Sequence, residues 1–135
     1  MPGVNTWVSR LQDVEPSRFA ALQAKDDLFI DSSHVLKVGS DVQWLFSEVL
    51  PMLERGVYVH FHDIFYPFEY PRPWIEEGRY WTEAYALRAF LTFNHVYEIV
   101  LFNTYLAKVH RDRLANLMPL CLKNEGGSIW LRRAA

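Results

Sequence analysis

The hydrophobic residues of this chain fall into short runs and one helical stripe. Segments rich in apolar residues cover 28–30, 57–61, 97–102 and 128–132, and each predicts a β-strand. Between the first two, Ser40 and Gln43 have the spacing of a capping box. The apolar residues that follow recur with helical spacing at Val42, Leu45, Phe46, Val49, Leu50 and Leu53. Residues 28–61 therefore predict two parallel strands joined by a right-handed helical crossover.

The second half of the chain predicts a loop, two helical segments and two strands. Proline and aromatic residues crowd 64–74, which favours an ordered loop over a regular helix or a central strand. Residues 82–93 predict a helix that begins at Thr82, and residues 104–118 have roughly helical spacing. Two short elements are expected near the N-terminus, a strand at 6–11 and a helix at 16–22.

Together these elements predict an α/β protein with a three-layer, partial Rossmann-like sheet. We expect about four or five strands, mostly parallel with an antiparallel last strand. The continuous apolar run at 28–30 is typical of a strand that is covered on both faces. A chain of 135 residues predicts a single domain over residues 1–135.

Composition and charge exclude several partners. The net charge of −2 leaves no basic footprint for nucleic acid. No apolar run approaches the roughly 20 residues that a membrane span needs. The start of the sequence also lacks the basic and apolar regions of a signal peptide. These observations favour a cytoplasmic protein that binds neither nucleic acid nor a membrane.

The first two strands are both followed by histidine and aspartate. Asp31 and His34 come after the first strand, and His62 and Asp63 come at the end of the second. Because the carboxyl ends of parallel strands meet at one edge of a sheet, we expect a single shared site. His34 is the candidate base, since imidazole titrates near neutrality. Asp31 and Asp63 are candidate ligands of a divalent cation, with His62 as a third ligand.

These residues also have structural interpretations, which the sequence leaves open. Asp31 is suited to capping its loop through Ser32 and Ser33, and His34 to contacting the helix cap at Ser40. His60, in mid-strand, is expected to be a hydrogen-bonded core histidine. The aromatic residues of the loop region form either an acceptor pocket or aromatic packing, and they are Tyr66, Phe68, Tyr70, Trp74 and Trp81.

The order and spacing of these motifs resemble a known family. Segments 29–34, 50–56 and 59–63 are similar to the class I S-adenosylmethionine-dependent methyltransferases, in particular to bacterial members related to the catechol-type O-methyltransferases. Segments 65–71, 118–124 and 126–131 strengthen the resemblance. It extends from about residue 11 to residue 132 and covers the C-terminal half of that fold.

The resemblance implies methyl transfer from S-adenosylmethionine to an oxygen of a small hydroxylated acceptor. Asp31 and Asp63 match two ligand positions for Mg²⁺ or another divalent metal. The third ligand position is Ile64 here, so His62 or His34 would take its place. Either His34 or a metal would then remove the acceptor proton.

The resemblance also indicates where the cofactor would bind. Gln12 and Asp13 match the position that contacts adenine, and with Asp31 they are the candidate cofactor-binding residues. The sequence has no counterpart of the family's glycine-rich turn or of the acidic residue that holds the ribose.

Two functions are consistent with this pattern. One is a methyltransferase completed by a companion polypeptide or by a dimer. The other is a catalytically inactive, truncated scaffold or interaction module. Because the strand at 28–30 lacks the neighbour that it has in the complete fold, its edge is exposed. We therefore expect a homodimer that forms through this edge or through an uncovered apolar face.

Overall fold

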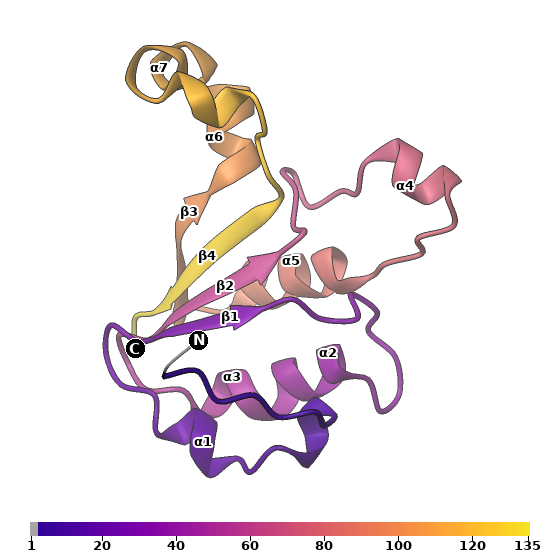
Figure 1. Cartoon of the computed structure of the whole chain (residues 1–135), viewed down its shortest axis with the longest axis vertical. Coiled ribbons are helices and arrows are strands. Elements are labelled where there is room, and N and C mark those ends of the chain that lie inside the picture. The colour runs from indigo at the N-terminus through magenta and orange to yellow at the C-terminus, as the bar shows by residue number, and fades with distance from the viewer. Residues whose placement is uncertain (1–2) are drawn as a thin grey trace.

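The computed structural model describes residues 3–135 and shows a four-stranded sheet with helices (Figure 1). The strands are β1 (Asp27–Ile30), β2 (Tyr58–His62), β3 (Tyr97–Phe102) and β4 (Ser128–Arg133). The first helices are η1 (Leu11–Asp13), α1 (Ser17–Ala20), α2 (Asp41–Trp44), η2 (Leu45–Val49) and α3 (Leu50–Met52). The others are α4 (Arg72–Glu76), α5 (Glu83–Phe93), α6 (Asn103–Val109), α7 (Arg111–Leu117) and η3 (Pro119–Leu122).

The strands lie in the order β1-β2-β4-β3. β1 and β2 are parallel, and β4 is antiparallel to both β2 and β3, between which it lies. The expected α/β class and the antiparallel last strand are therefore confirmed. β1 has β2 as its neighbour and forms one edge of the sheet.

The hydrophobic core lies on one face of the sheet. Side chains on this face of β2 and β4 are fully buried, namely Val59, Phe61, Ile129 and Leu131. Helical side chains that belong to the same core are also almost fully buried, namely Leu45, Val49, Leu50, Ala84 and Leu87. Figure 1 shows α2, α3 and α5 together on this side of the sheet.

The expectation of a three-layer sheet is wrong for residues 3–135. The opposite face carries Phe29, His60, Trp130 and Leu101, which the strand register aligns in one row. Phe29 is 60% exposed, so β1 is not covered on both faces. The chain advances from β1 to β2 and on to β3 in one direction across the sheet. Two right-handed crossovers in the same direction place their helices on the same face.

The helix after β1 forms as expected, with one local change. Ser40 caps it, and the Ser40 hydroxyl accepts a hydrogen bond from the backbone N–H of Gln43 at 3.1 Å. The turn at η2 is a π-helix. Pro51, which has no N–H to donate, is the second residue of α3, two positions after this widened turn ends at Val49.

Three other segments differ from the sequence expectations. Residues 6–11 form no strand, and η1 begins at Leu11. The helical segment at 104–118 breaks at His110 into α6 and α7. The loop after β2 ends in the short helix α4, where Pro73 occupies the first turn and needs no hydrogen-bond partner for its nitrogen. Within residues 3–135, no helix is both long and apolar enough to cross a membrane.

Candidate functional site

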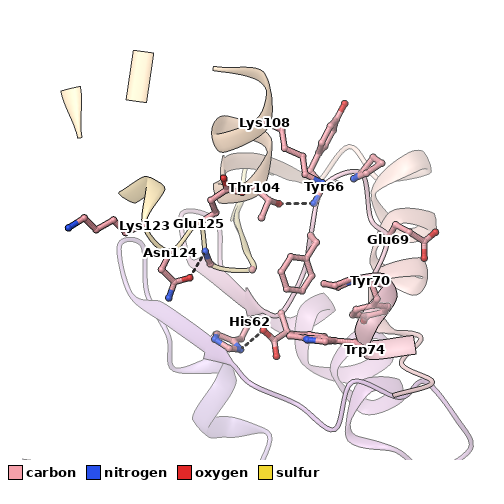
Figure 2. Close-up of a pocket in the computed structure, with 16 residues that line it drawn as sticks. His62, Tyr66, Glu69, Tyr70, Trp74, Thr104, Lys108, Lys123, Asn124 and Glu125 are labelled. Carbon is pink, nitrogen blue, oxygen red and sulfur yellow. Dashed lines mark hydrogen bonds and ion pairs between the residues drawn. The ribbon is translucent and has the colours of Figure 1, made fainter. Parts of the chain in front are cut away.

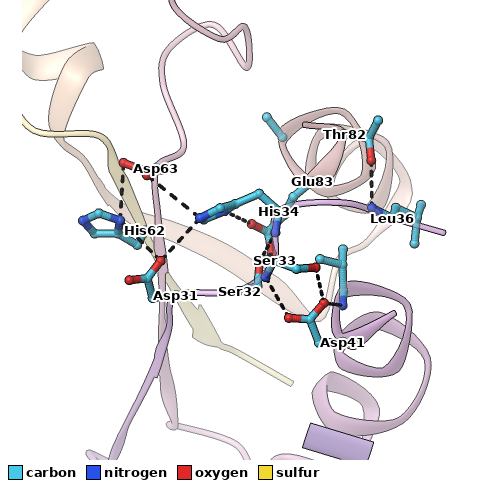
Figure 3. A network of polar contacts seen from close by, with 12 residues as sticks. Asp31, Ser32, Ser33, His34, Leu36, Asp41, His62, Asp63, Thr82 and Glu83 are labelled. Atoms are coloured by element: carbon cyan, nitrogen blue, oxygen red, sulfur yellow. Dashed lines mark hydrogen bonds and ion pairs between the residues drawn. The ribbon is translucent and has the colours of Figure 1, made fainter. Parts of the chain in front are cut away.

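Polar side chains from β1, β2 and α5 meet at the carboxyl ends of the two parallel strands (Figure 3). His34 Nε2 lies 3.4 Å from Asp31 Oδ1 and 3.9 Å from Asp63 Oδ2. His34 and Asp63 both have a positive φ, 59° and 56°, which non-glycine residues rarely adopt. The convergence expected for Asp31, His34 and Asp63 is therefore present in the structure.

Glu83 completes this cluster, and the sequence interpretation missed it. Glu83 lies in the first turn of α5 and is 1% exposed. One carboxylate oxygen lies 2.8 Å from His34 Nδ1, and the other accepts a hydrogen bond from the Ser32 hydroxyl at 2.9 Å. The only signal in the sequence is an acidic residue in the first turn of the predicted helix at 82–93, and acidic residues are common there on solvent-exposed helices.

The surroundings of His34 change its proton affinity. Burial by itself lowers the pKa of His34. The hydrogen bond and charge of Glu83, together with the charges of Asp63 and Asp31, outweigh burial and raise the pKa above its ordinary value. The folded protein therefore favours the protonated imidazolium more than the unfolded chain does.

This shift predicts a pH dependence of stability. Because the pKa of His34 is higher in the folded state, its contribution to stability is fully present below about pH 6.5 and is lost as pH rises through the folded pKa. We expect His34→Asn to remove this contribution, because asparagine tolerates a positive φ but does not titrate. Urea unfolding of both proteins between about pH 5 and 9 would measure it.

The pH dependence of stability in the wild type alone would not isolate His34, because the titration of another histidine changes the stability in the opposite direction. Burial, and to a smaller degree the charge of His62, lowers the pKa of His60, and Asp31 offsets this only in part. His60 therefore favours folding at higher pH. Parallel stability profiles for the wild type and His34→Asn would contradict the prediction, whereas a difference that shrinks above neutrality is the expected result.

In the structure, Asp31 does not cap its loop and His34 does not contact the helix cap at Ser40, the two alternatives that the sequence left open. The loop after β1 is capped by Asp41, whose carboxylate accepts hydrogen bonds from the backbone N–H of Ser33, at 2.7 Å, and from the Ser33 hydroxyl. The Asp31 side chain is 59% exposed and faces the two histidines. His34 contacts Glu83 on α5 and not the Ser40 cap.

The two histidines of β2 differ in their roles. His60 is buried, its ring stacked on Phe29 with centroids 4.3 Å apart and edge-on to Trp130. It packs as the structural interpretation predicts, but its Nδ1 has no hydrogen-bond partner among the described residues. His62 is partly exposed, and its Nδ1 lies 3.3 Å from Asp63 Oδ1 and 3.7 Å from Asp31 Oδ1.

Asp31, Asp63 and His62, the expected metal ligands, therefore lie close together. However, no set of three or more His, Cys, Asp or Glu side chains in residues 3–135 is arranged to hold a metal ion. Among these three side chains the shortest contact between histidine and carboxylate is 3.3 Å, from His62 Nδ1 to Asp63 Oδ1. Metal binding stays a prediction, and no chemical step below depends on it.

The two expected adenine contacts, Gln12 and Asp13, have partners outside this cluster. The Gln12 amide donates a hydrogen bond to the carbonyl oxygen of Gly39 at 2.8 Å. The Asp13 carboxylate accepts two hydrogen bonds from Arg10, at 2.8 and 2.9 Å. Of the three candidate cofactor-binding residues, only Asp31 therefore lies in the cluster around His34. Gln12 and Asp13 lie in η1.

A cavity of about 860 Å³ opens beside the cluster (Figure 2). Asp63 and His62 line one end of it, and the loop after β2 supplies an aromatic wall of Phe65, Tyr66, Tyr70 and Trp74. The opposite wall comes from α6 and the segment before β4, namely Thr104, Lys108, Lys123, Asn124, Glu125, Gly126 and Gly127. This size and largely apolar lining suit a small organic ligand. Of the expected aromatic residues, Phe68 and Trp81 do not line the cavity.

The aromatic wall is fixed by contacts with the rest of the fold. The Tyr70 hydroxyl accepts a hydrogen bond from the backbone N–H of Ala84 at 3.0 Å, and burial raises the pKa of this hydroxyl. The Thr104 hydroxyl accepts a hydrogen bond from the backbone N–H of Tyr66 at 2.7 Å. A Cβ at Gly127 would overlap the ring of Phe65, so only glycine leaves room for that ring. The loop is therefore an ordered wall.

Comparison of the chain with protein-family models, with curated proteins and with solved structures gave no match. The functional interpretation consequently depends on the residues and on the geometry described above.

Proposed function

We propose that this chain is the acceptor-binding part of an S-adenosylmethionine-dependent O-methyltransferase. The observation that carries the proposal is the position of Asp63, which belongs both to the His34 cluster and to the end of the aromatic cavity. A hydroxyl group bound at that end would lie next to a carboxylate that is 3.9 Å from an imidazole nitrogen. An oriented base beside a ligand cavity is what methyl transfer to oxygen requires.

Residues of the chain have distinct roles in this proposal. Bound S-adenosylmethionine would supply an electrophilic methyl group on a positively charged sulfonium. Asp63 would hold the acceptor hydroxyl at its end of the cavity, and His34 Nε2, which lies 3.9 Å from that carboxylate, would take up the proton through Asp63. The imidazolium that results is stabilised by the carboxylates of Glu83, Asp31 and Asp63. Asp31, the most exposed of the three, also attracts a cationic donor.

The remainder of the cofactor pocket is proposed to come from a companion polypeptide or from a second copy. Within residues 3–135, the edge of β1 has no strand partner and the face with Phe29 is uncovered, and both observations support this requirement. Antiparallel pairing of two β1 edges would bring Asp26 and Asp27 of one copy near Asp31 of the other. Because like charges repel, burial of the face is the better homodimer contact.

A second candidate function is a scaffold without catalytic activity. The uncovered sheet face supports it, because Phe29, 60% exposed, and Leu101, 40% exposed, lie there in one row with Trp130, and a continuous exposed apolar face is typical of an interaction surface. The two functions differ in whether the chain binds S-adenosylmethionine.

Isothermal titration calorimetry with S-adenosylmethionine distinguishes the two functions. We expect saturable binding that is weakened by Asp31→Asn, because the variant loses a charge that attracts the sulfonium. Asp27→Asn, at the other end of the same exposed strand, is the matched control and should bind as the wild type does. The titration would be repeated with Mg²⁺, and unchanged binding would count against the metal site predicted at Asp31 and Asp63.

Light scattering of the same sample shows whether the binding species is a dimer. No heat up to millimolar cofactor, with a dimeric sample, would contradict methyl transfer by the homodimer and favour the scaffold. Binding by a monomer would contradict the need for a second copy.

A further inference from the structure

Glu83 is a carboxylate that the fold buries against the candidate base. Its side chain is 1% exposed, and its two oxygens contact Ser32 and His34. A buried carboxylate is costly unless its oxygens have partners. Here the contacts link α5 to the loop after β1, about fifty positions earlier in the chain.

Backbone hydrogen bonds tie the same loop to the start of α5. The carbonyl oxygen of His34 accepts hydrogen bonds from the N–H groups of Thr82 and Glu83, at 2.9 and 3.1 Å. The N–H of Leu36 donates to the Thr82 hydroxyl at 2.8 Å. The ring of Trp81 covers the imidazole, with centroids 4.1 Å apart. The position of the His34 ring is therefore determined by the start of α5.

The hydrogen bonds around Glu83 form a closed circuit (Figure 3). The backbone N–H of His34 donates to the Ser32 hydroxyl at 2.9 Å, and that hydroxyl donates to Glu83. The other Glu83 oxygen faces His34 Nδ1 at 2.8 Å. An ionised carboxylate can only accept hydrogen bonds, so Nδ1 must carry the proton.

We propose that Glu83 is the positioning residue of this site and keeps the proton of the neutral His34 ring on Nδ1. The lone pair of Nε2 then faces Asp31 and Asp63, on the side of the aromatic cavity. This inference deepens the proposed function and rests on it for the role of Nε2 as the atom that receives the acceptor proton. In other imidazole bases, too, a carboxylate that binds one ring nitrogen fixes the tautomer and leaves the other nitrogen able to accept a proton.

The tautomer of His34 can be measured directly. Two-bond ¹⁵N–¹H correlation spectra of the ¹⁵N-labelled protein, recorded at alkaline pH where the ring is neutral, show which nitrogen is protonated. We expect the Nδ1–H form for the wild type. A ring protonated on Nε2, or the mixture typical of free histidine, would overturn the proposal.

Glu83→Gln provides the second measurement. The Ser32 hydroxyl still needs an acceptor, so the glutamine carbonyl oxygen takes this hydrogen bond and the amide N–H group donates to Nδ1. The ring should therefore change to the Nε2–H form, and an unchanged ring would overturn the proposal. Glu76→Gln makes the same substitution on an exposed residue of α4 and should leave the tautomer unchanged.

Ser32→Ala covers the case in which Glu83→Gln does not fold. It removes the hydrogen bond to one oxygen of Glu83 and leaves the contact with Nδ1. The Nδ1–H form should persist in this variant, and its loss would show that Glu83 does not hold the tautomer on its own.

These spectra need neither cofactor nor acceptor, so the two proposals can fail separately. An Nδ1–H ring that changes in Glu83→Gln supports the positioning role even if calorimetry detects no S-adenosylmethionine. If methyl transfer is measurable, Glu83→Gln should lower kcat and leave the KM of the acceptor nearly unchanged, because Glu83 does not line the cavity. A rise in KM alone would contradict a role in proton transfer.

Discussion

Replacing Phe61 by alanine is expected to lower the free energy of unfolding by about 3–5 kcal/mol. Phe61 is fully buried in β2, where the register places it between Ile30 of β1 and Ile129 of β4. Its ring also stacks on Phe46 of η2, with centroids 5.9 Å apart. Alanine would leave a cavity between the sheet and the helical side chains that pack on this face. Urea denaturation monitored by circular dichroism measures the change.

Phe93→Ala is the matched control for this prediction. Phe93 is the last residue of α5 and is 86% exposed. Its replacement should change the free energy of unfolding by no more than about 0.5 kcal/mol. Equal effects of the two substitutions would contradict the assignment of Phe61 to the core.

His34→Asn is expected to lower the rate of methyl transfer by about 10²–10⁴-fold, the usual contribution of a general base. Asparagine keeps a polar side chain and tolerates the φ of 59°, so the loop after β1 should retain its shape. It cannot accept a proton at the position of Nε2. The rate would be measured with labelled S-adenosylmethionine, using a sample that binds the cofactor by calorimetry.

His95→Asn makes the same substitution on an exposed residue just before β3. It should leave the rate unchanged. If His34→Asn also left the rate unchanged while the cofactor still bound, the proton acceptor would have to be another group, and Asp63, which lines the cavity, would be the next to test.

Local sequence patterns were sufficient for most secondary structure. The apolar runs predicted all four strands, and the capping box predicted where the helix after β1 begins. These elements are encoded within a few residues, because side-chain periodicity and end capping are local properties. The weak pattern at 6–11 failed because it had no strand neighbour with which to pair.

The sequence also predicted one half of the site. Asp31, His34, His62 and Asp63 directly follow or end two parallel strands, so strand direction alone brings them to one edge. The other half could not be predicted in this way. Glu83 reaches His34 only because α5 packs beside the loop after β1. Asp41 caps the same loop from the first residue of α2, eight positions after Ser33, a contact that the sequence pattern did not single out.

By itself, the sequence determined the elements of this protein and the residues at the two strand ends, because both depend on neighbours in the chain. The tertiary structure decided that α2, α3 and α5 lie on one face, that Phe29 is exposed on the other, and that a buried carboxylate contacts His34. Each of these depends on the order of strands in the sheet and on the side taken by each crossover, which local periodicity does not encode.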